Sequence, residues 1–211
     1  MKKLLFLLLP AITFAKYNAT ISPITPQIKQ RMVNGGSYKS YCPISLNDLR
    51  YIKLKYIGFD NKEHMGELIV NKRVAKDIVN IFRELYNIKY PIKQMRLVSD
   101  FDASDYASIE ADNTSAFNCR YVDGTKKWSN HTYGKAVDIN PIENPYVSNS
   151  GHTSHKKSYP FVARVRKNSS PAYKAMLLKS DRAVKIFKKY GFRWGGEWRC
   201  CKDYQHFDKK K

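Results

Sequence analysis

The stretch of the sequence with the clearest chemical potential reads SNHTYGKAVDINP and begins at Ser129. It holds His131 and Asp138, seven positions apart, with Gly134 between them, and both residue types bind metals. Asp138 interrupts a short apolar run, so strand alternation places its carboxylate on the face opposite its apolar neighbours. A carboxylate in a buried strand needs a partner, and a metal ion is one candidate.

A second pairing of acid and histidine occurs near the end of the chain, where Asp203 precedes His206 by three positions. A catalytic zinc commonly has three protein ligands and one open position, and a carboxylate base must stand beside the attacking water. We therefore expect His131, Asp138 and His206 to bind one metal, with Asp203 facing the water. The plain alternatives are structural histidines, an aspartate that caps a turn or pairs with arginine, and an ordinary turn acid.

Two other groups compete for these roles. His152 and His155 could both bind a metal, but no carboxylate follows at a matching spacing, which favours a solvated loop. Glu197 could replace Asp203 as the base, although Asp203 fits the short spacing between acid and histidine better.

Both motifs resemble those of a known family. The stretch from Ser129 to Asp138 is similar to the pattern Ser-x-His-x-x-Gly-x-Ala-x-Asp of zinc D-alanyl-D-alanine peptidases, the VanX and VanY relatives together with L-alanyl-D-glutamate endopeptidases. The acid-x-x-His half matches Asp203 to His206. The surrounding NTSAFNCR, INPIENPY and WGGEW resemble the VanY-like carboxypeptidase branch, and the resemblance covers roughly residues 90 to 208.

The resemblance implies a Zn²⁺ ion held by His131, Asp138 and His206, with Asp203 as general base. The better-known carboxypeptidases often have Glu at the base position, so Asp203 is closer to the endopeptidase branch. The family also places an arginine near the scissile carbonyl, in a Tyr-Arg-Ser context that this chain lacks. Arg120 is the substitute that we predict, and its alternative is a salt bridge to the acidic loop at residues 100–113.

Ser129, at the start of the first motif, has two candidate roles. It could bind the backbone of the substrate or orient the turn that carries the histidine.

The elements that must position these residues follow from periodicity. Residues 51–59 alternate as a strand, residues 67–70 return as its hairpin partner, and a helical stripe runs from residue 74 to residue 85. We also expect strands at residues 92–98 and 115–122, a short helix at residues 181–190 with Ser180 as N-cap, and final strands at residues 192–194 and 204–208. This order predicts an α+β fold, a mainly antiparallel sheet with flanking helices. The resemblance implies a DD-peptidase/hedgehog-like arrangement with the zinc site on the sheet.

The first fifteen residues predict export. A basic start precedes an apolar run too short to span a bilayer, and Ala15 fits a cleavage point. A buried N-terminal strand or helix is the alternative. We therefore predict a signal peptide at residues 1–15, an N-terminal extension at 16–50 and the zinc peptidase domain at 51–211. No other segment is of transmembrane length, so we expect no membrane insertion once the signal is removed.

The net charge of +20 and the pI near 9.8 favour polyanionic neighbours. A solvated, lysine-rich surface is the alternative. Export argues against nucleic acid as the partner and favours a periplasmic or cell-wall location.

Four cysteines suit an oxidising compartment and allow three disulfide connectivities. Ring strain disfavours a bond between the adjacent Cys200 and Cys201, so we expect these two to pair with Cys42 and Cys119.

The leading hypothesis is a zinc metallopeptidase that hydrolyses peptidoglycan stem peptides as a D-Ala-D-Ala carboxypeptidase or an L-Ala-D-Glu-type endopeptidase. The alternative is a non-catalytic cell-wall-binding protein that retains the fold and a structural metal.

Overall fold

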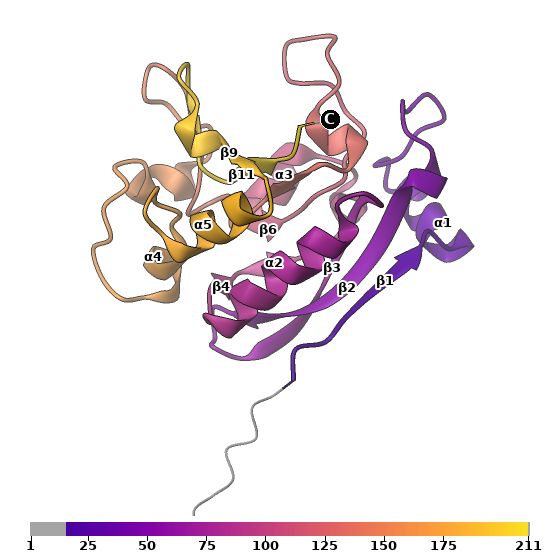
Figure 1. The fold of residues 1–211 in the computed structure, drawn as a ribbon. Helices are drawn as coiled ribbons and strands as arrows, with labels where there is room; N and C mark the ends of the chain where they lie inside the picture. Colours follow the sequence, from indigo (N-terminus) through magenta and orange to yellow (C-terminus); the bar gives the residue numbers. More distant parts are fainter. Residues whose placement is uncertain (1–15, 211) are drawn as a thin grey trace, which may run out of the picture.

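The computed structural model describes residues 16–210 of the chain. The predicted signal peptide at residues 1–15 lies outside the described residues. The fold is α+β, as the sequence predicts, with mostly antiparallel sheets and short helices (Figure 1). The strands are β1 (Ala19–Pro23), β2 (Leu49–Gly58), β3 (Glu63–Asn71), β4 (Pro91–Ile92), β5 (Gln94–Met95), β6 (Asn113–Thr114), β7 (Ala136–Asp138), β8 (Tyr146–Val147), β9 (Arg193–Trp194), β10 (Lys202–Asp203) and β11 (His206–Asp208). The α-helices are α1 (Pro26–Asn34), α2 (Ala75–Asn87), α3 (Asp105–Glu110), α4 (Pro171–Ala175) and α5 (Arg182–Lys189). Short 3₁₀ helices are η1 (Leu46–Asp48), η2 (Val98–Phe101), η3 (Asn130–Tyr133), η4 (Lys156–Phe161) and η5 (Gly195–Glu197).

The largest sheet has β2 at its centre. β1 and β3 pair with β2 antiparallel, and β4 adds to it in parallel. Helix α2 crosses one face of this sheet (Figure 1) and buries the apolar stripe that the sequence indicates. Val137 and Phe207 belong to the same hydrophobic core, so the strands that carry the metal-binding candidates pack on the main body of the protein.

Residues 19–34 belong to the N-terminal extension predicted from the sequence, and they supply β1 and α1. β1 pairs with β2 along five residues, and Met32 of α1 is fully buried in a second hydrophobic cluster. The boundary predicted at residue 50 stays a prediction.

Two predicted strands are much shorter than expected, because side chains and separate segments take up their backbone donors. In residues 92–98, Lys93 N donates to Asn140 Oδ1 and Arg96 N donates to Asn113 Oδ1. The chain therefore forms only β4 and β5 before turning into η2.

In residues 115–122, successive donors reach three different segments. Ser115 pairs with Asp138, Phe117 N donates to Ile69 O, and Cys119 N donates to Ser37 O. Because these donors bond to separate segments, no continuous strand ladder forms, and β6 ends at Thr114. The short helix near residue 181 forms as expected, but Asp181 rather than Ser180 is its N-cap residue.

The disulfide expectation is wrong. Cys42 and Cys119 bond to each other, with 6.1 Å between their Cα atoms, and Cys200 and Cys201 are free thiols. Packing decides this pairing, because Cys42 and Cys119 share the second hydrophobic cluster. The sulfur atoms of Cys200 and Cys201 lie 3.1 Å apart on an exposed loop.

Candidate metal centre

The turn that carries His131 is fixed by the residues at its two ends. Ser129 Oγ accepts a hydrogen bond from His131 N at 3.3 Å, as an N-cap does. Gly134 ends the turn with a φ of +63°, and a Cβ atom there would lie 2.5 Å from the backbone nitrogen of Asn71. Both the conformation and the space demand glycine at this position.

Two adjacent strands bring the other candidates together. β7 and β11 pair antiparallel, and the register places His206 directly opposite Asp138. Strand alternation sends their neighbours, Val137 and Phe207, into the hydrophobic core. His131, Asp138 and His206 therefore meet on the other face of this small sheet, from segments about 70 residues apart along the chain.

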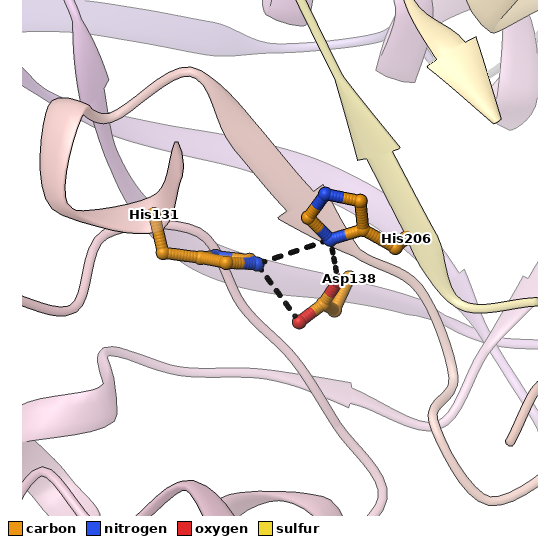
Figure 2. Close-up of side chains that lie close together, drawn as sticks. All are labelled: His131, Asp138 and His206. Carbon is orange, nitrogen blue, oxygen red and sulfur yellow. Dashed lines mark hydrogen bonds and ion pairs between the residues drawn. The ribbon is translucent and has the colours of Figure 1, made fainter. Parts of the chain in front are cut away.

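The three side chains converge closely (Figure 2). His131 Nε2 lies 3.2 Å from His206 Nδ1 and 3.1 Å from Asp138 Oδ2, and His206 Nδ1 lies 3.0 Å from Asp138 Oδ1. All three are buried, with exposed fractions of 4%, 7% and 7%. Among residues 16–210, these three are the group of histidine, cysteine and acid side chains that could hold a metal ion.

The donor set and its spacing fit zinc. Ligand bonds of about 2.0 to 2.1 Å in a tetrahedron place neighbouring donor atoms about 3.3 Å apart. The three observed separations, 3.0 to 3.2 Å, agree closely with that edge length. Two imidazoles and one carboxylate also leave a fourth tetrahedral position open, as catalytic zinc sites do.

The backbone selects which nitrogen of His131 faces the site. Its Nδ1 lies 2.5 Å from the carbonyl oxygen of Ala116 and therefore carries the proton. The lone pair of Nε2 is then directed at Asp138 and His206.

Electrostatics hold Asp138 in its anionic form. Burial alone would raise the pKa of Asp138, but the imidazoles of His131 and His206 outweigh burial and hold that pKa far below its ordinary value. Burial likewise tends to lower the pKa of His206, but the neighbouring carboxylates of Asp138 and Asp208 raise it to about 10. The positive charge of protonated His206 compensates the negative charge of Asp138. A metal dication that binds here would therefore displace the proton of His206.

The candidate base, Asp203, lies on β10, opposite Tyr146 of β8. The side chain is partly exposed, but its Oδ1 atom is buried and has no hydrogen-bond partner. Burial raises the pKa of Asp203 to about 6, and the charge of His206 opposes that rise. A carboxylate with a free buried oxygen and a pKa near neutrality is suited to accepting a proton.

Arg120 forms the salt bridge to the acidic loop that was the alternative to its catalytic role. Its Nη2 lies 2.9 Å from Asp105 Oδ2, within the acidic loop. The catalytic role of Arg120 stays a prediction. Ser129 orients the turn through its hydroxyl, and its contact with substrate also stays a prediction.

The rival groups are engaged elsewhere. The carboxylate of Glu197 pairs with Lys188 Nζ at 2.9 and 3.0 Å. His152 is exposed, as expected of a solvated loop, whereas His155 is buried, and Glu110 from the acidic loop accepts its Nδ1 hydrogen at 2.9 Å. The ring of Tyr106 stacks on His155, 4.5 Å between centroids.

The ring of Trp198 lies 5.4 Å from that of His206 and forms part of the site's surroundings. One residue of the site, Asp208, was missed from the sequence. Asp208 stands two residues after His206 on β11, and its Oδ2 lies 3.8 Å from His206 Nε2. Strand alternation could have indicated Asp208, because residues two apart share a face.

A pair of buried acids lies outside the metal centre, with Glu143 after β7 and Asp112 just before β6. Glu143 is 4% exposed, and burial together with the neighbouring charge of Asp112 raises the pKa of Glu143 to about 10. The carboxyl of Glu143 therefore keeps its proton to a higher pH than an ordinary glutamate does. The largest causes of this shift, burial and Asp112, lie outside the metal centre.

Residues 123–209 match a family model described as D-alanyl-D-alanine carboxypeptidase. This match confirms the resemblance stated from the sequence, and its range includes His131, Asp138, Asp203 and His206 but not Arg120. It indicates a peptidase related to peptidoglycan. No curated protein and no solved structure matches the chain. No helix within residues 16–210 is long and apolar enough to cross a membrane.

Proposed function

We propose that this chain is a zinc-dependent peptidase that hydrolyses peptide bonds in the stem peptides of peptidoglycan. The observation that carries the proposal is the buried convergence of His131, Asp138 and His206 at the spacing of zinc ligands. This group lies within the part of the chain that matches the carboxypeptidase family model. Zinc bound there would supply Lewis acidity, which acidifies a water molecule and polarises the scissile carbonyl.

The protein's own groups would handle the proton. Asp203 takes a proton from the attacking water at its free Oδ1 and later delivers it to the leaving amine. His131 and His206 keep their ring nitrogens directed at the site, and Asp138 supplies the negative charge that favours a cation.

The bond that is cut is either D-Ala-D-Ala, at the end of the stem peptide, or L-Ala-D-Glu, within it. Asp203 in place of the common Glu favours the endopeptidase branch, while the matched family model is described as a carboxypeptidase. Arg120, whose guanidinium pairs with Asp105 in the free protein, would stabilise the oxyanion.

The proposal extends to location and fold family. The N-terminal sequence supports export to the periplasm or cell surface, where the net charge of +20 favours the acidic wall polymer. Because this attraction is electrostatic, binding of the protein to purified cell-wall sacculi should weaken as salt concentration rises. The position of the site on a sheet supports a DD-peptidase/hedgehog-like fold.

The deciding experiment incubates the zinc-loaded protein with purified sacculi and identifies the released peptides by mass spectrometry. New stem-peptide products are expected from the wild type, and their masses state which bond is cut. Asp203→Asn should lower the rate by about 10²- to 10⁴-fold while zinc remains bound. Glu197→Gln is the matched control and should keep the wild-type rate, because Glu197 pairs with Lys188.

Each failure has a distinct meaning. Zinc bound to the wild type without any new product would support the non-catalytic wall-binding alternative. If Asp203→Asn cleaved sacculi at the wild-type rate, Asp203 would not be the base, but the peptidase assignment would still hold.

A further inference from the structure

The last strand places one carboxylate behind the metal centre. In β11, His206 and Asp208 share a face, while Phe207 between them is fully buried in the core. Asp208 is only 2% exposed, so its negative charge requires nearby donors.

Those donors tie Asp208 to two other segments. Arg193, its register partner on β9, donates from Nε to Oδ1 at 2.9 Å and from Nη2 to Oδ2 at 2.6 Å. Asn130 Nδ2 donates to Oδ2 at 2.5 Å. Asn130 immediately precedes His131, so one carboxylate links the strand of one candidate ligand to the turn of another.

The orientation of the His206 ring places its Nε2 atom on the side of Asp208. The Nδ1 atom of His206 faces Asp138 and His131, which leaves Nε2 directed at the back of the site. Asp208 Oδ2 lies 3.8 Å from that Nε2, within the range of an ion pair and beyond a hydrogen bond. If Nδ1 donates its lone pair to a metal, the ring proton must reside on Nε2, beside Asp208.

We propose that Asp208 is a positioning residue of the metal centre, which holds His206 with its proton on Nε2 and anchors the His131 turn through Asn130. This inference rests on the zinc site of the proposed function. Carboxylates that orient a metal-binding imidazole typically contribute about 10- to 100-fold in metal affinity.

The competing explanation is that Asp208 serves only the ion pair with Arg193. The side chain of Arg193 is 47% exposed, and Asn130 also donates to Asp208, so the carboxylate keeps a hydrogen-bond donor when the guanidinium is removed. Loss of the pair alone should therefore change zinc affinity by less than about fivefold. Arg193→Gln removes the pair and keeps Asp208, which makes it the matched control for Asp208→Asn.

The experiment measures zinc affinity of the full chain by competition with a chromophoric chelator. We expect Asp208→Asn to bind zinc about 10- to 100-fold more weakly and Arg193→Gln to stay within about fivefold of the wild type. Proton NMR of the zinc-loaded protein supplies a second readout. The His206 ring N–H resonance should lie downfield in the wild type and Arg193→Gln, and move upfield in Asp208→Asn.

Zinc affinity of Asp208→Asn within about fivefold of the wild type would overturn the inference, as would equal losses in both variants. If Asp208→Asn does not fold, absence of a downfield His206 ring resonance in the wild type overturns it. A wild type that binds no zinc overturns this inference together with the zinc site. Zinc binding with the expected variant effects, but no peptide cleavage, overturns the proposed activity alone.

Discussion

Replacement of Gly134 by alanine tests how the fold holds His131 in place. Gly134 ends the η3 turn at a φ of +63°, and its carbonyl accepts a hydrogen bond from Asn71 N at 2.8 Å. An added Cβ would lie 2.5 Å from Asn71 N and 2.9 Å from the carbonyl carbon of Val70. Both atoms are backbone at the end of β3, so no side-chain rotation can relieve the contact.

Gly124 is the matched control, because it has a similar φ of +68° and nothing within 4 Å of an added Cβ. The left-handed conformation costs an alanine about 1 to 2 kcal/mol at either position. Steric overpacking adds about 1 to 3 kcal/mol at Gly134 alone. We therefore expect Gly134→Ala to lose about 2 to 5 kcal/mol of unfolding free energy, against about 1 to 2 kcal/mol for Gly124→Ala.

Urea denaturation of both variants measures this difference, and chelator competition measures zinc affinity. Relief of the clash must move either β3 or the turn, so Gly134→Ala should bind zinc at least about fivefold more weakly, equivalent to about 1 kcal/mol. Gly124→Ala should bind zinc as the wild type does. Equal stability losses in the two variants would refute the packing argument, and unchanged zinc affinity in Gly134→Ala would show that the turn does not transmit the strain to His131.

Three further predictions concern the base, a buried acid and the disulfide. A Cβ at Gly195 would lie 2.4 Å from the carbonyl oxygen of Asp203, so Gly195→Ala should lower kcat by about 100-fold with zinc retained; an unchanged kcat would contradict this. The pKa of Glu143 is raised to about 10, so the unfolded chain releases a proton above about pH 4.5 that the folded chain keeps, and stability falls as pH rises. In the wild type, the unfolding free energy should therefore fall by up to about 4 kcal/mol between about pH 5 and 8, and Glu143→Gln should lack this fall. If the two proteins lost stability in parallel, Glu143 would not be its source. The bond between Cys42 and Cys119 spans 77 positions, so replacing both by alanine should cost about 4 kcal/mol in urea denaturation, and a loss below about 1 kcal/mol would contradict the loop-entropy estimate.

Local sequence patterns account for much of the scaffold. Alternation in residues 51–59 and the stripe from residue 74 to residue 85 predicted β2 and α2, because burial of one face imposes a fixed period. The same logic predicted that Asp138 faces away from its apolar neighbours, which the β7–β11 register confirms. The predictions for residues 92–98 and 115–122 were wrong in extent, since the pattern could not show which distant groups take the backbone donors.

The sequence by itself determined the residue types of the site and their spacing within each motif. The tertiary structure alone decided that His206 lies opposite Asp138, that Ala116 selects the nitrogen of His131, and that Asp208 stands behind His206. It also decided that Cys42 bonds to Cys119 and that Arg120 contacts Asp105. The physical reason is that a periodic pattern states which face a side chain occupies, whereas strand register and loop packing state which distant residue it meets there.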